Sequence, residues 1–199
     1  MAHAGSPLAG DTIYLCTADR HGNLVSLIQS LYFPFGSGVV VKDTGILLQN
    51  RGAYFSLRED HINRLEPVKR TLHTLMPAMA FREGKPFLVF GTMGGEGQPQ
   101  TQLQVLCNLI DFGMSLKEAI AAPRWLMGPR SQGAPHCLHL EGGIAEQVGE
   151  ELKAKGHIIK REERLAEFFG HAHAILVDER RGIYQGASDP RSDGSAIAW

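Results

Sequence analysis

The chain has 199 residues, of which 43% are hydrophobic and 21% charged, a composition typical of a folded protein with one large domain or two small ones. Its 20 basic and 21 acidic residues give a formal charge of -1, so the sequence offers no basic surface for nucleic acid and no polybasic membrane anchor. Because no segment approaches the roughly 20 apolar residues of a membrane helix and residues 1–10 do not resemble a signal peptide, we expect a cytoplasmic protein. A periplasmic or secreted protein is the alternative if the chain is made from a longer precursor with a signal peptide.

Strand patterns dominate the first half of the chain. Residues 13–18 and 24–31 are predicted strands that flank the turn "DRHGN". The same pattern of two strands joined by a turn recurs about the turn residues 43–45 and again about residues 83–85. Three hairpins in succession predict a largely antiparallel sheet.

Helical patterns follow Gly95. The first predicted helix has its apolar side chains on one face at three- and four-residue spacing: Leu103, Leu106, Leu109 and Ile110. Ser115 and Glu118 fit a capping box for a second, short helix that Pro123 ends. A third helix is predicted within residues 143–157.

The tail returns to strand patterns at residues 171–178 and 182–189. Hairpins followed by helices and a further hairpin indicate an α+β protein, because strands and helices do not alternate one by one as in a doubly wound sheet. The apolar faces of the predicted sheets need to be covered by helices, and a four-layer sandwich of helices and sheets meets this requirement. The periodicity alone does not separate it from a two-layer fold.

Two local features can carry chemistry. Gly94 and Gly95 join a strand to a helix, where exposed backbone amides and the helix start favour a negative oxygen, although such a pair is more often a plain turn. Pairing the first two strands about their turn places Thr12 opposite Ser30, so their hydroxyls can meet. The ordinary alternative is a solvated Thr and Ser at a strand end.

The cysteines and histidines favour structural roles. Three cysteines without a CxxC pair argue against a disulfide framework. The clusters "HCLH" (136–139) and "GHAHA" (170–174) lack a partner half at metal-ligand spacing, so we interpret their histidines as hydrogen-bonded or exposed and expect no metal.

Several segments together resemble the small, C-terminal subunit of γ-glutamyltransferases, which belong to the N-terminal nucleophile (Ntn) hydrolase superfamily. The resemblance extends from about Asp11 nearly to the end of the chain. It rests on these segments: "DT", "DRHGN", "FGSGVVV", "GILLQNRGAYFSL", "FGTMGGEGQPQ", "AIAAPRW" and "GASDPRS". The resemblance implies an αββα Ntn sandwich, to which this chain contributes the small-subunit part, and a small-molecule amide substrate without a cofactor.

The resemblance also implies a division of the chain and roles for four residues. Residues 1–11 would be a leader or remnant before a self-cleavage site, and residues 12–199 the Ntn domain. The freed amine of Thr12 would act as base for its own hydroxyl, the nucleophile. Ser30 matches a position that hydrogen-bonds the nucleophile, and Gly94 and Gly95 match the backbone oxyanion hole.

The substrate-binding positions depart from the family pattern. His73 and Thr74 stand where two serines help to hold the substrate carboxylate. Tyr54 replaces the acid that binds the α-ammonium of a γ-glutamyl donor, Arg51 replaces a Gln or Glu, and Tyr32 replaces an Asn. "QNRGAYFSL" is more similar to the branch of cephalosporin and glutaryl acylases, so we expect γ-glutamyl or related acyl donors.

The resemblance further implies a partner. Family precursors carry a large subunit before the nucleophile, whereas only eleven residues precede Thr12 here. We therefore expect either a large-subunit partner or self-association, with this chain a small subunit or a fragment. The alternative is a non-catalytic, unprocessed paralogue that acts only in binding or assembly.

Overall fold

The computed structural model describes residues 11–128 and 135–199, so the predicted leader at residues 1–10 lies outside the described residues. The elements in chain order are β1 (Asp11–Ala18), β2 (Leu24–Tyr32), η1 (Arg51–Tyr54), β3 (Ala78–Arg82), β4 (Lys85–Thr92), η2 (Gly95–Gly97), α1 (Gln98–Ile110), α2 (Leu116–Ala121), β5 (Trp125–Gly128), β6 (Cys137–Glu141), α3 (Glu146–Ala154), β7 (Ile159–Glu162), η3 (Glu167–Phe169), β8 (Ala172–Asp178) and β9 (Ile183–Ser188). No helix in these two ranges has the length and hydropathy needed to cross a bilayer.

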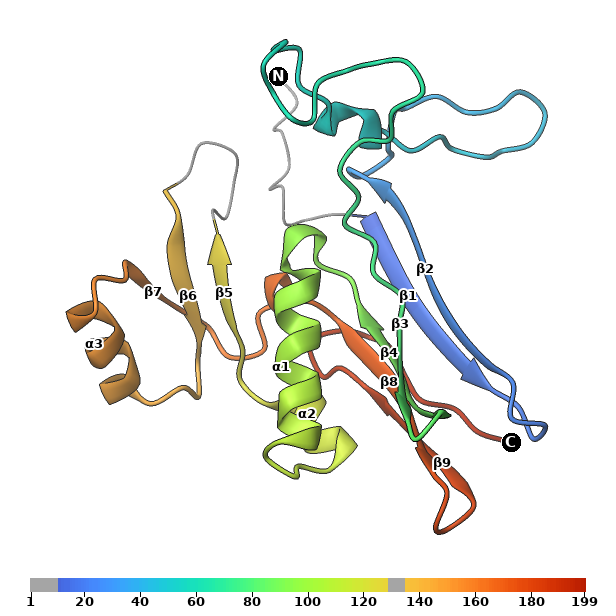
Figure 1. The fold of residues 1–199 in the computed structure, drawn as a ribbon, viewed down its shortest axis with the longest axis vertical. Coiled ribbons are helices and arrows are strands. Elements are labelled where there is room, and N and C mark those ends of the chain that lie inside the picture. The colour runs from blue at the N-terminus through green and yellow to red at the C-terminus, as the bar shows by residue number, and fades with distance from the viewer. Residues whose placement is uncertain (1–10, 129–134) are drawn as a thin grey trace.

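The strands form three sheets in the described part of the chain (Figure 1). β1 and β2 form an antiparallel hairpin, and β3-β4-β8-β9 form a four-stranded antiparallel sheet. The third sheet has the order β5-β6-β7, with β6 and β7 parallel. The α+β class and the mainly antiparallel pairing agree with the sequence prediction.

The four-stranded sheet lies between the β1-β2 hairpin and a helical layer. On one face, α1 and α2 pack on the sheet through the following core residues: Leu88, Phe90, Val105, Leu116, Ile120, Ala172 and Ala174. On the other face the ring of Tyr14 in β1 covers Gly91 of β4, where an added Cβ would come within 2.3 Å of the ring. This position requires a glycine because β1 crosses directly over it and leaves no room for a side chain.

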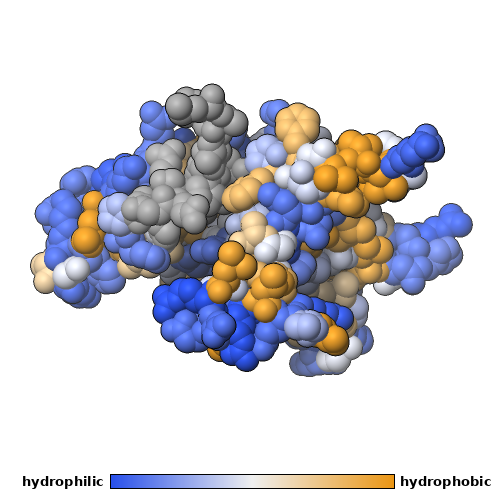
Figure 2. Space-filling model, turned by 90° about the horizontal axis from the view of Figure 1, so that it is seen from above, coloured by the Kyte–Doolittle hydropathy of each residue, from blue (hydrophilic) through white to orange (hydrophobic). Residues whose placement is uncertain are grey.

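The outer face of the β1-β2 hairpin is apolar and exposed. Its side chains alternate with the buried Tyr14 because successive residues of a strand point to opposite faces. Ile13, Leu15, Val25 and Leu27 have exposed fractions of 56%, 41%, 45% and 40%. Figure 2 shows hydrophobic side chains gathered in patches between hydrophilic ones on one face of the molecule. Residues 11–128 and 135–199 therefore leave one side of a two-sheet sandwich without a cover.

One predicted hairpin was wrong, and three strands were not predicted. Residues 39–48 close a turn with the single bridge Val40–Leu47 instead of forming strands. Their valines and leucines are largely exposed, so no sheet lies beneath to extend the pairing. The short strands β5, β6 and β7 were not predicted, because the buried strand β6 carries His139 and Glu141 where a central strand is usually apolar.

The face that α1 buries also differs from the prediction. Leu103 and Ile110 are half-exposed, whereas Gln98, Thr101 and Gln102 are buried beside Val105. Polar side chains are stable in the interior where they hydrogen-bond to backbone. Here those backbone groups belong to Met76 and Phe169.

Candidate active site

Thr12 and Ser30 meet at the start of β1, as the strand pairing predicted. The register pairs Thr12 with Ser30, and their hydroxyl oxygens lie 2.7 Å apart, within hydrogen-bond distance. The register is irregular here, because Asp11 pairs with Tyr32 and Thr12 with Ser30, which leaves Leu31 of β2 without a partner in β1. Bulges at strand ends redirect side chains and recur beside active sites.

Tyr32, two residues after Ser30 at the end of β2, has an unusual backbone conformation. Tyr32 has a φ of 77°, a left-handed conformation that is rare for an aromatic residue. Its amide donates to Ser30 Oγ at 2.9 Å, and its ring stacks on Phe33 at 4.3 Å between centroids. Because Ser30 Oγ accepts this bond, its own proton is free to turn toward Thr12.

Four of the predicted substrate-binding residues form one cluster. Tyr32 and Tyr54 have ring centroids 4.6 Å apart, and the guanidinium carbon of Arg51 lies 5.1 Å from the first and 5.9 Å from the second. Arg51 Nη1 donates to Thr74 Oγ1 at 2.8 Å. Burial and the neighbouring Tyr32 raise the pKa of Tyr54, so this phenol stays protonated and supplies no negative charge.

A cavity of about 370 Å³ opens beside Ser30. The residues that line it are Ser30, Gln49, Arg51, Gly52, Phe55, Arg70, Thr71, His73 and Leu75. Partial burial lowers the pKa of His73, and the positive charges of Arg51 and Arg70 lower it further. His73 is therefore neutral at pH 7, in a surrounding whose fixed charges are positive.

Gly94 and Gly95 form the turn between β4 and α1. Both have positive φ, 135° and 53°, which explains why glycine occupies each position. The turn follows Gly91, which Tyr14 covers, and Thr12 lies two residues before Tyr14 on the same face of β1. The start of β1 and the end of β4 therefore lie at the same end of the two sheets (Figure 1).

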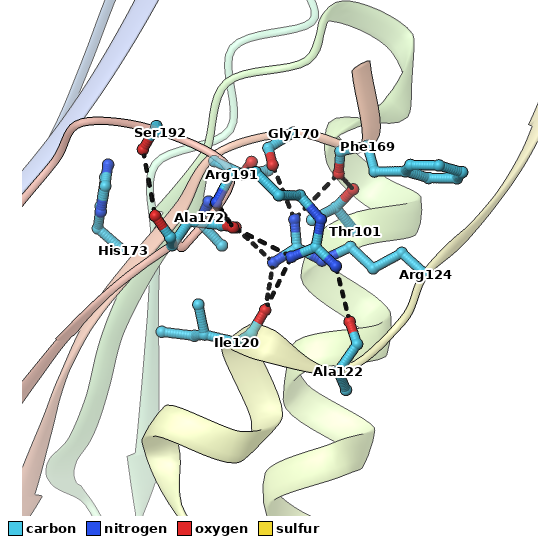
Figure 3. A network of polar contacts seen from close by, with 12 residues as sticks. Thr101, Ile120, Ala122, Arg124, Phe169, Gly170, Ala172, His173, Arg191 and Ser192 are labelled. Atoms are coloured by element: carbon cyan, nitrogen blue, oxygen red, sulfur yellow. Dashed lines mark hydrogen bonds and ion pairs between the residues drawn. The ribbon is translucent and has the colours of Figure 1, made fainter. Parts of the chain in front are cut away.

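The glycine turn rests on a second turn, at Phe169 and Gly170. A Cβ on Gly94 would be 3.6 Å from Gly170 Cα, and a Cβ on Gly170 would clash with Thr92 Oγ1 at 2.6 Å. Thr101 Oγ1 donates to Phe169 O, and Arg124 Nη1 donates to both Phe169 O and Gly170 O (Figure 3). Arg124 thus fixes the backbone that packs against the glycine turn.

Arg124 belongs to a buried ion network that the sequence reading missed. Its Nη2 lies 2.6 Å from Asp189 Oδ2. Arg191 forms two further ion pairs: its Nη1 lies 3.0 Å from Asp189 Oδ1, and its Nη2 lies 2.5 Å from Glu141 Oε2. All four side chains are at most 1% exposed. These residues come from "APRW", "GASDPRS" and β6, so the network ties three distant segments together.

Three amide side chains also position the site without having been predicted. Gln98 Oε1 accepts from Met76 N and Gln102 Nε2 donates to Met76 O, so the start of α1 holds the segment between Thr74 and β3. Asn63 Nδ2 donates to Tyr54 O at 2.7 Å and to Thr71 Oγ1 at 3.0 Å. The run of alternate glutamines in α1 was the available sequence signal, whereas Asn63 gave none.

His139 and His173 of the two histidine clusters are hydrogen-bonded, whereas His171 Nε2 is buried without a hydrogen-bond partner in the described part of the chain, contrary to the prediction. His139 contacts Glu162 through Nδ1 at 2.8 Å and Cys137 Sγ through Nε2 at 3.2 Å. His173 Nδ1 contacts Ser188 Oγ at 3.0 Å. Within residues 11–128 and 135–199, no group of three or more His, Cys, Asp or Glu side chains could hold a metal ion.

Comparisons with known proteins agree with this arrangement. The chain is 50% identical to the glutathione hydrolase-like YwrD proenzyme of Bacillus subtilis and 44% identical to the oxamate amidohydrolase proenzyme of Klebsiella pneumoniae. Each match covers 96% of this chain but only 36% of the relative, so the chain spans about a third of the length of these curated relatives.

Solved structures share the fold. Cephalosporin acylase from Bacillus halodurans superposes with a TM-score of 0.85 at 42% identity, over 94% of this chain and 34% of the acylase. A γ-glutamyltranspeptidase chain from Pseudomonas nitroreducens superposes with a TM-score of 0.78 at 31% identity, over 94% of this chain and 98% of the other. The fold is therefore that of the Ntn-hydrolase γ-glutamyltranspeptidases and acylases.

The family model described as gamma-glutamyltranspeptidase matches residues 2–199, nearly the whole chain. Together with the identities above, this match establishes the relationship that the motifs indicated. The chain belongs to the γ-glutamyltranspeptidase family.

Proposed function

We propose that this chain is the nucleophile-bearing part of an enzyme that hydrolyses amides or transfers their acyl groups through Thr12. The observation that carries the proposal is the 2.7 Å contact between Thr12 Oγ1 and Ser30 Oγ at the start of β1, beside a cavity that Ser30 lines. A threonine hydroxyl needs an adjacent base, and a freed α-amine with a pKa of about 8 provides one without a histidine.

The chemistry proceeds in two steps. Thr12 Oγ attacks the amide carbonyl while its proton passes to the Thr12 α-amine, and backbone amides at Gly94 and Gly95 stabilise the oxyanion. The carbon–nitrogen bond then breaks, and the leaving amine takes the proton. Water attacks the resulting ester and regenerates Thr12, or an amine acceptor takes the acyl group instead.

The α-amine must first be released by cleavage between Asp11 and Thr12. Thr12 Oγ attacks the Asp11 carbonyl carbon, the peptide nitrogen is displaced, and water hydrolyses the ester, leaving an Asp11 carboxylate and a free Thr12 amine. The contact of the Thr12 hydroxyl with Ser30 supports such an attack. Intact-mass measurement of fresh and aged protein tests it: cleavage yields Thr12 as a new N-terminus, and a persistently intact chain favours the non-catalytic alternative.

We propose acyl donors without an α-ammonium as the substrates. Tyr54 supplies no carboxylate for an ammonium, and Arg51 adds a like charge nearby. The name of the Klebsiella relative assigns it oxamate, an amide whose acyl part carries a carboxylate and no ammonium.

Glutaryl amides are therefore expected to be better substrates than the corresponding γ-glutamyl amides. The lost charge-assisted hydrogen bond to the ammonium costs about 1.5–3 kcal/mol, or roughly 10- to 150-fold in kcat/KM. Steady-state kinetics of the assembled enzyme with p-nitroanilides of both acids measures the ratio. Equal kcat/KM values for the two donors would count against the assignment of this subsite.

We also propose that a large subunit completes the enzyme. The relatives are about three times as long as the matched region, and the apolar outer face of β1-β2 is exposed in the described residues. A catalytic geometry held to about half an ångström requires a complete surrounding shell.

The chain purified alone is accordingly expected to show little or no amide hydrolysis and to run larger than a monomer. Its exposed apolar side chains would drive association with a second copy when no large subunit covers them. Sizing with light scattering and an amide hydrolysis assay measure both properties. A well-behaved monomer with ordinary turnover would show that no further subunit is needed.

A further inference from the structure

A thiol, an imidazole and a carboxylate follow one another in the β5-β6-β7 sheet, outside the cavity beside Ser30. Cys137 and His139 are two residues apart in β6, so their side chains lie on the same face of the sheet. Cys137 Sγ is 3.2 Å from His139 Nε2, and His139 Nδ1 is 2.8 Å from Glu162 Oε1 in β7. A nucleophile within reach of a base that a third group orients is the arrangement that activates cysteine thiols.

Glu162 and Gly128 enable His139 to take up the thiol proton. The neutral ring donates from Nδ1 to the Glu162 carboxylate and accepts from the Cys137 thiol at Nε2. Nε2 also lies 3.2 Å from Gly128 O, so an imidazolium that forms here donates to acceptors at both of its nitrogens. Lys160 Nζ lies 3.4 Å from the same Glu162 oxygen, but its side chain is half-exposed and solvent screens its charge.

A small pocket adjoins this cluster. Its volume is about 30 Å³, and the residues that line it include His139, Gly97, Leu126 and Gly128. Gly128 pairs with Cys137 in the β5-β6 register, so the pocket lies next to the residue that carries the thiol. The volume holds about one or two molecules of the size of water, so hydrogen peroxide fits and an organic hydroperoxide does not.

The other two cysteines provide an internal comparison, because both are more exposed than Cys137. Burial raises the pKa of the Cys16 thiol to about 11, and the hydrogen bond to Asp111 raises the pKa of the Cys107 thiol. Exposure alone would therefore make Cys137 the slowest of the three to react with peroxide. The base beside it would make it the fastest, because the thiolate is the nucleophile.

We propose that Cys137 is a site of oxidation by hydrogen peroxide, with His139 as its base and Glu162 as the group that orients His139. The sulfur attacks one peroxide oxygen, so a sulfur–oxygen bond forms and the oxygen–oxygen bond breaks. His139 takes the thiol proton and gives it to the departing hydroxide, which leaves as water. The cysteine is oxidised to a sulfenic acid and the peroxide is reduced. This chemistry does not involve Thr12 and is independent of the proposed function.

The test compares the three cysteines within one sample. The purified protein, including any subunit that copurifies, is exposed to hydrogen peroxide for timed intervals, and catalase then removes the peroxide. The protein is unfolded in dimedone, which traps every sulfenic acid regardless of burial, and is mapped by tandem mass spectrometry. We expect Cys137 to be oxidised at least about 10-fold faster than Cys16 or Cys107.

Variants separate the base from the fold. His139→Gln should slow the oxidation of Cys137 by about 100-fold because it removes the base, and Glu162→Gln should slow it by a smaller factor because the base remains. His136→Gln alters an exposed histidine beside Cys137 and should change no rate. An unchanged rate at Cys16 shows that a variant is folded, because unfolding would expose this thiol and speed its reaction.

The size of the pocket predicts a second result. Cumene hydroperoxide is too large for a volume of about 30 Å³, so its preference for Cys137 over Cys107 should be at least about 10-fold lower than that of hydrogen peroxide.

Three results would each overturn the proposal: Cys137 oxidised no faster than Cys107, oxidation of Cys137 unaffected by His139→Gln, or the same preference for Cys137 with both peroxides. A buried thiol whose hydrogen bond to His139 serves only the fold would give the first two.

Discussion

Thr12→Ala is expected to abolish both cleavage of the Asp11–Thr12 bond and amide turnover, with kcat falling at least about 1,000-fold. The substitution removes the only hydroxyl that the β1-β2 register places opposite Ser30, and alanine has no nucleophilic atom. Intact mass reports the cleavage, and steady-state kinetics of the assembled enzyme reports the turnover.

Matched variants on the same strand make the result specific. Thr12→Ser keeps a hydroxyl and should retain cleavage at a reduced rate. Thr17→Ala alters an exposed threonine near the other end of β1 and should change neither property. Cleavage that continues in Thr12→Ala would remove Thr12 from its role.

Asp189→Asn is expected to lower the free energy of unfolding by about 3–5 kcal/mol, because it leaves the buried guanidinium of Arg124 without its carboxylate. Asp189 accepts hydrogen bonds from Arg124, from the amide of Ala172 and from Arg191. Urea denaturation measures the change. Asp193→Asn, an exposed substitution four residues away, should lie within about 0.5 kcal/mol of the wild type.

The same carboxylate predicts a pH dependence. Burial alone would raise the pKa of Asp189, but Arg124, the Ala172 amide and Arg191 outweigh it and hold that pKa below its ordinary value. The stabilisation is therefore complete above the unfolded-state pKa of about 3.9 and is lost as the pH falls toward the folded-state pKa. The Asn variant should lose this part of the acid sensitivity. A variant as stable as Asp193→Asn, with unchanged pH dependence, would contradict the role of the network.

The hairpins and their registers could be predicted because strand alternation and turn residues are local signals. The pairing of Thr12 with Ser30 followed from the length of the turn alone. The capping box of Ser115 and Glu118 was likewise confirmed, since both of its hydrogen bonds are present. Such features depend on a few neighbouring residues and not on the tertiary fold.

Features that depend on distant partners could not be predicted. The polar residues that α1 buries look like a solvated face until the backbone of Met76 and Phe169 is placed beside them. β6 carries His139 and Glu141 because Glu162 and Arg191 satisfy them from other segments. Periodicity counts hydrophobic residues, so it misses elements whose burial rests on such pairs.

The substrate-binding positions illustrate the same limit. The resemblance to the family identified Arg51, Tyr54 and Thr74 as departures from its pattern, but did not indicate that they contact one another. The structure joins Arg51 to Thr74 and places the two tyrosines over its guanidinium. Only this geometry shows that Arg51 is buried beside a cavity.

The most direct test of the account is to identify the residue that carries the acyl group during turnover. The assembled wild-type enzyme is mixed with a slowly hydrolysed glutaryl amide, quenched in acid, digested and mapped by tandem mass spectrometry. We expect glutarylation on the side-chain oxygen of Thr12 in a peptide that begins with Thr12. Acylation of another residue, or turnover by a chain in which the Asp11–Thr12 bond is intact, would contradict it.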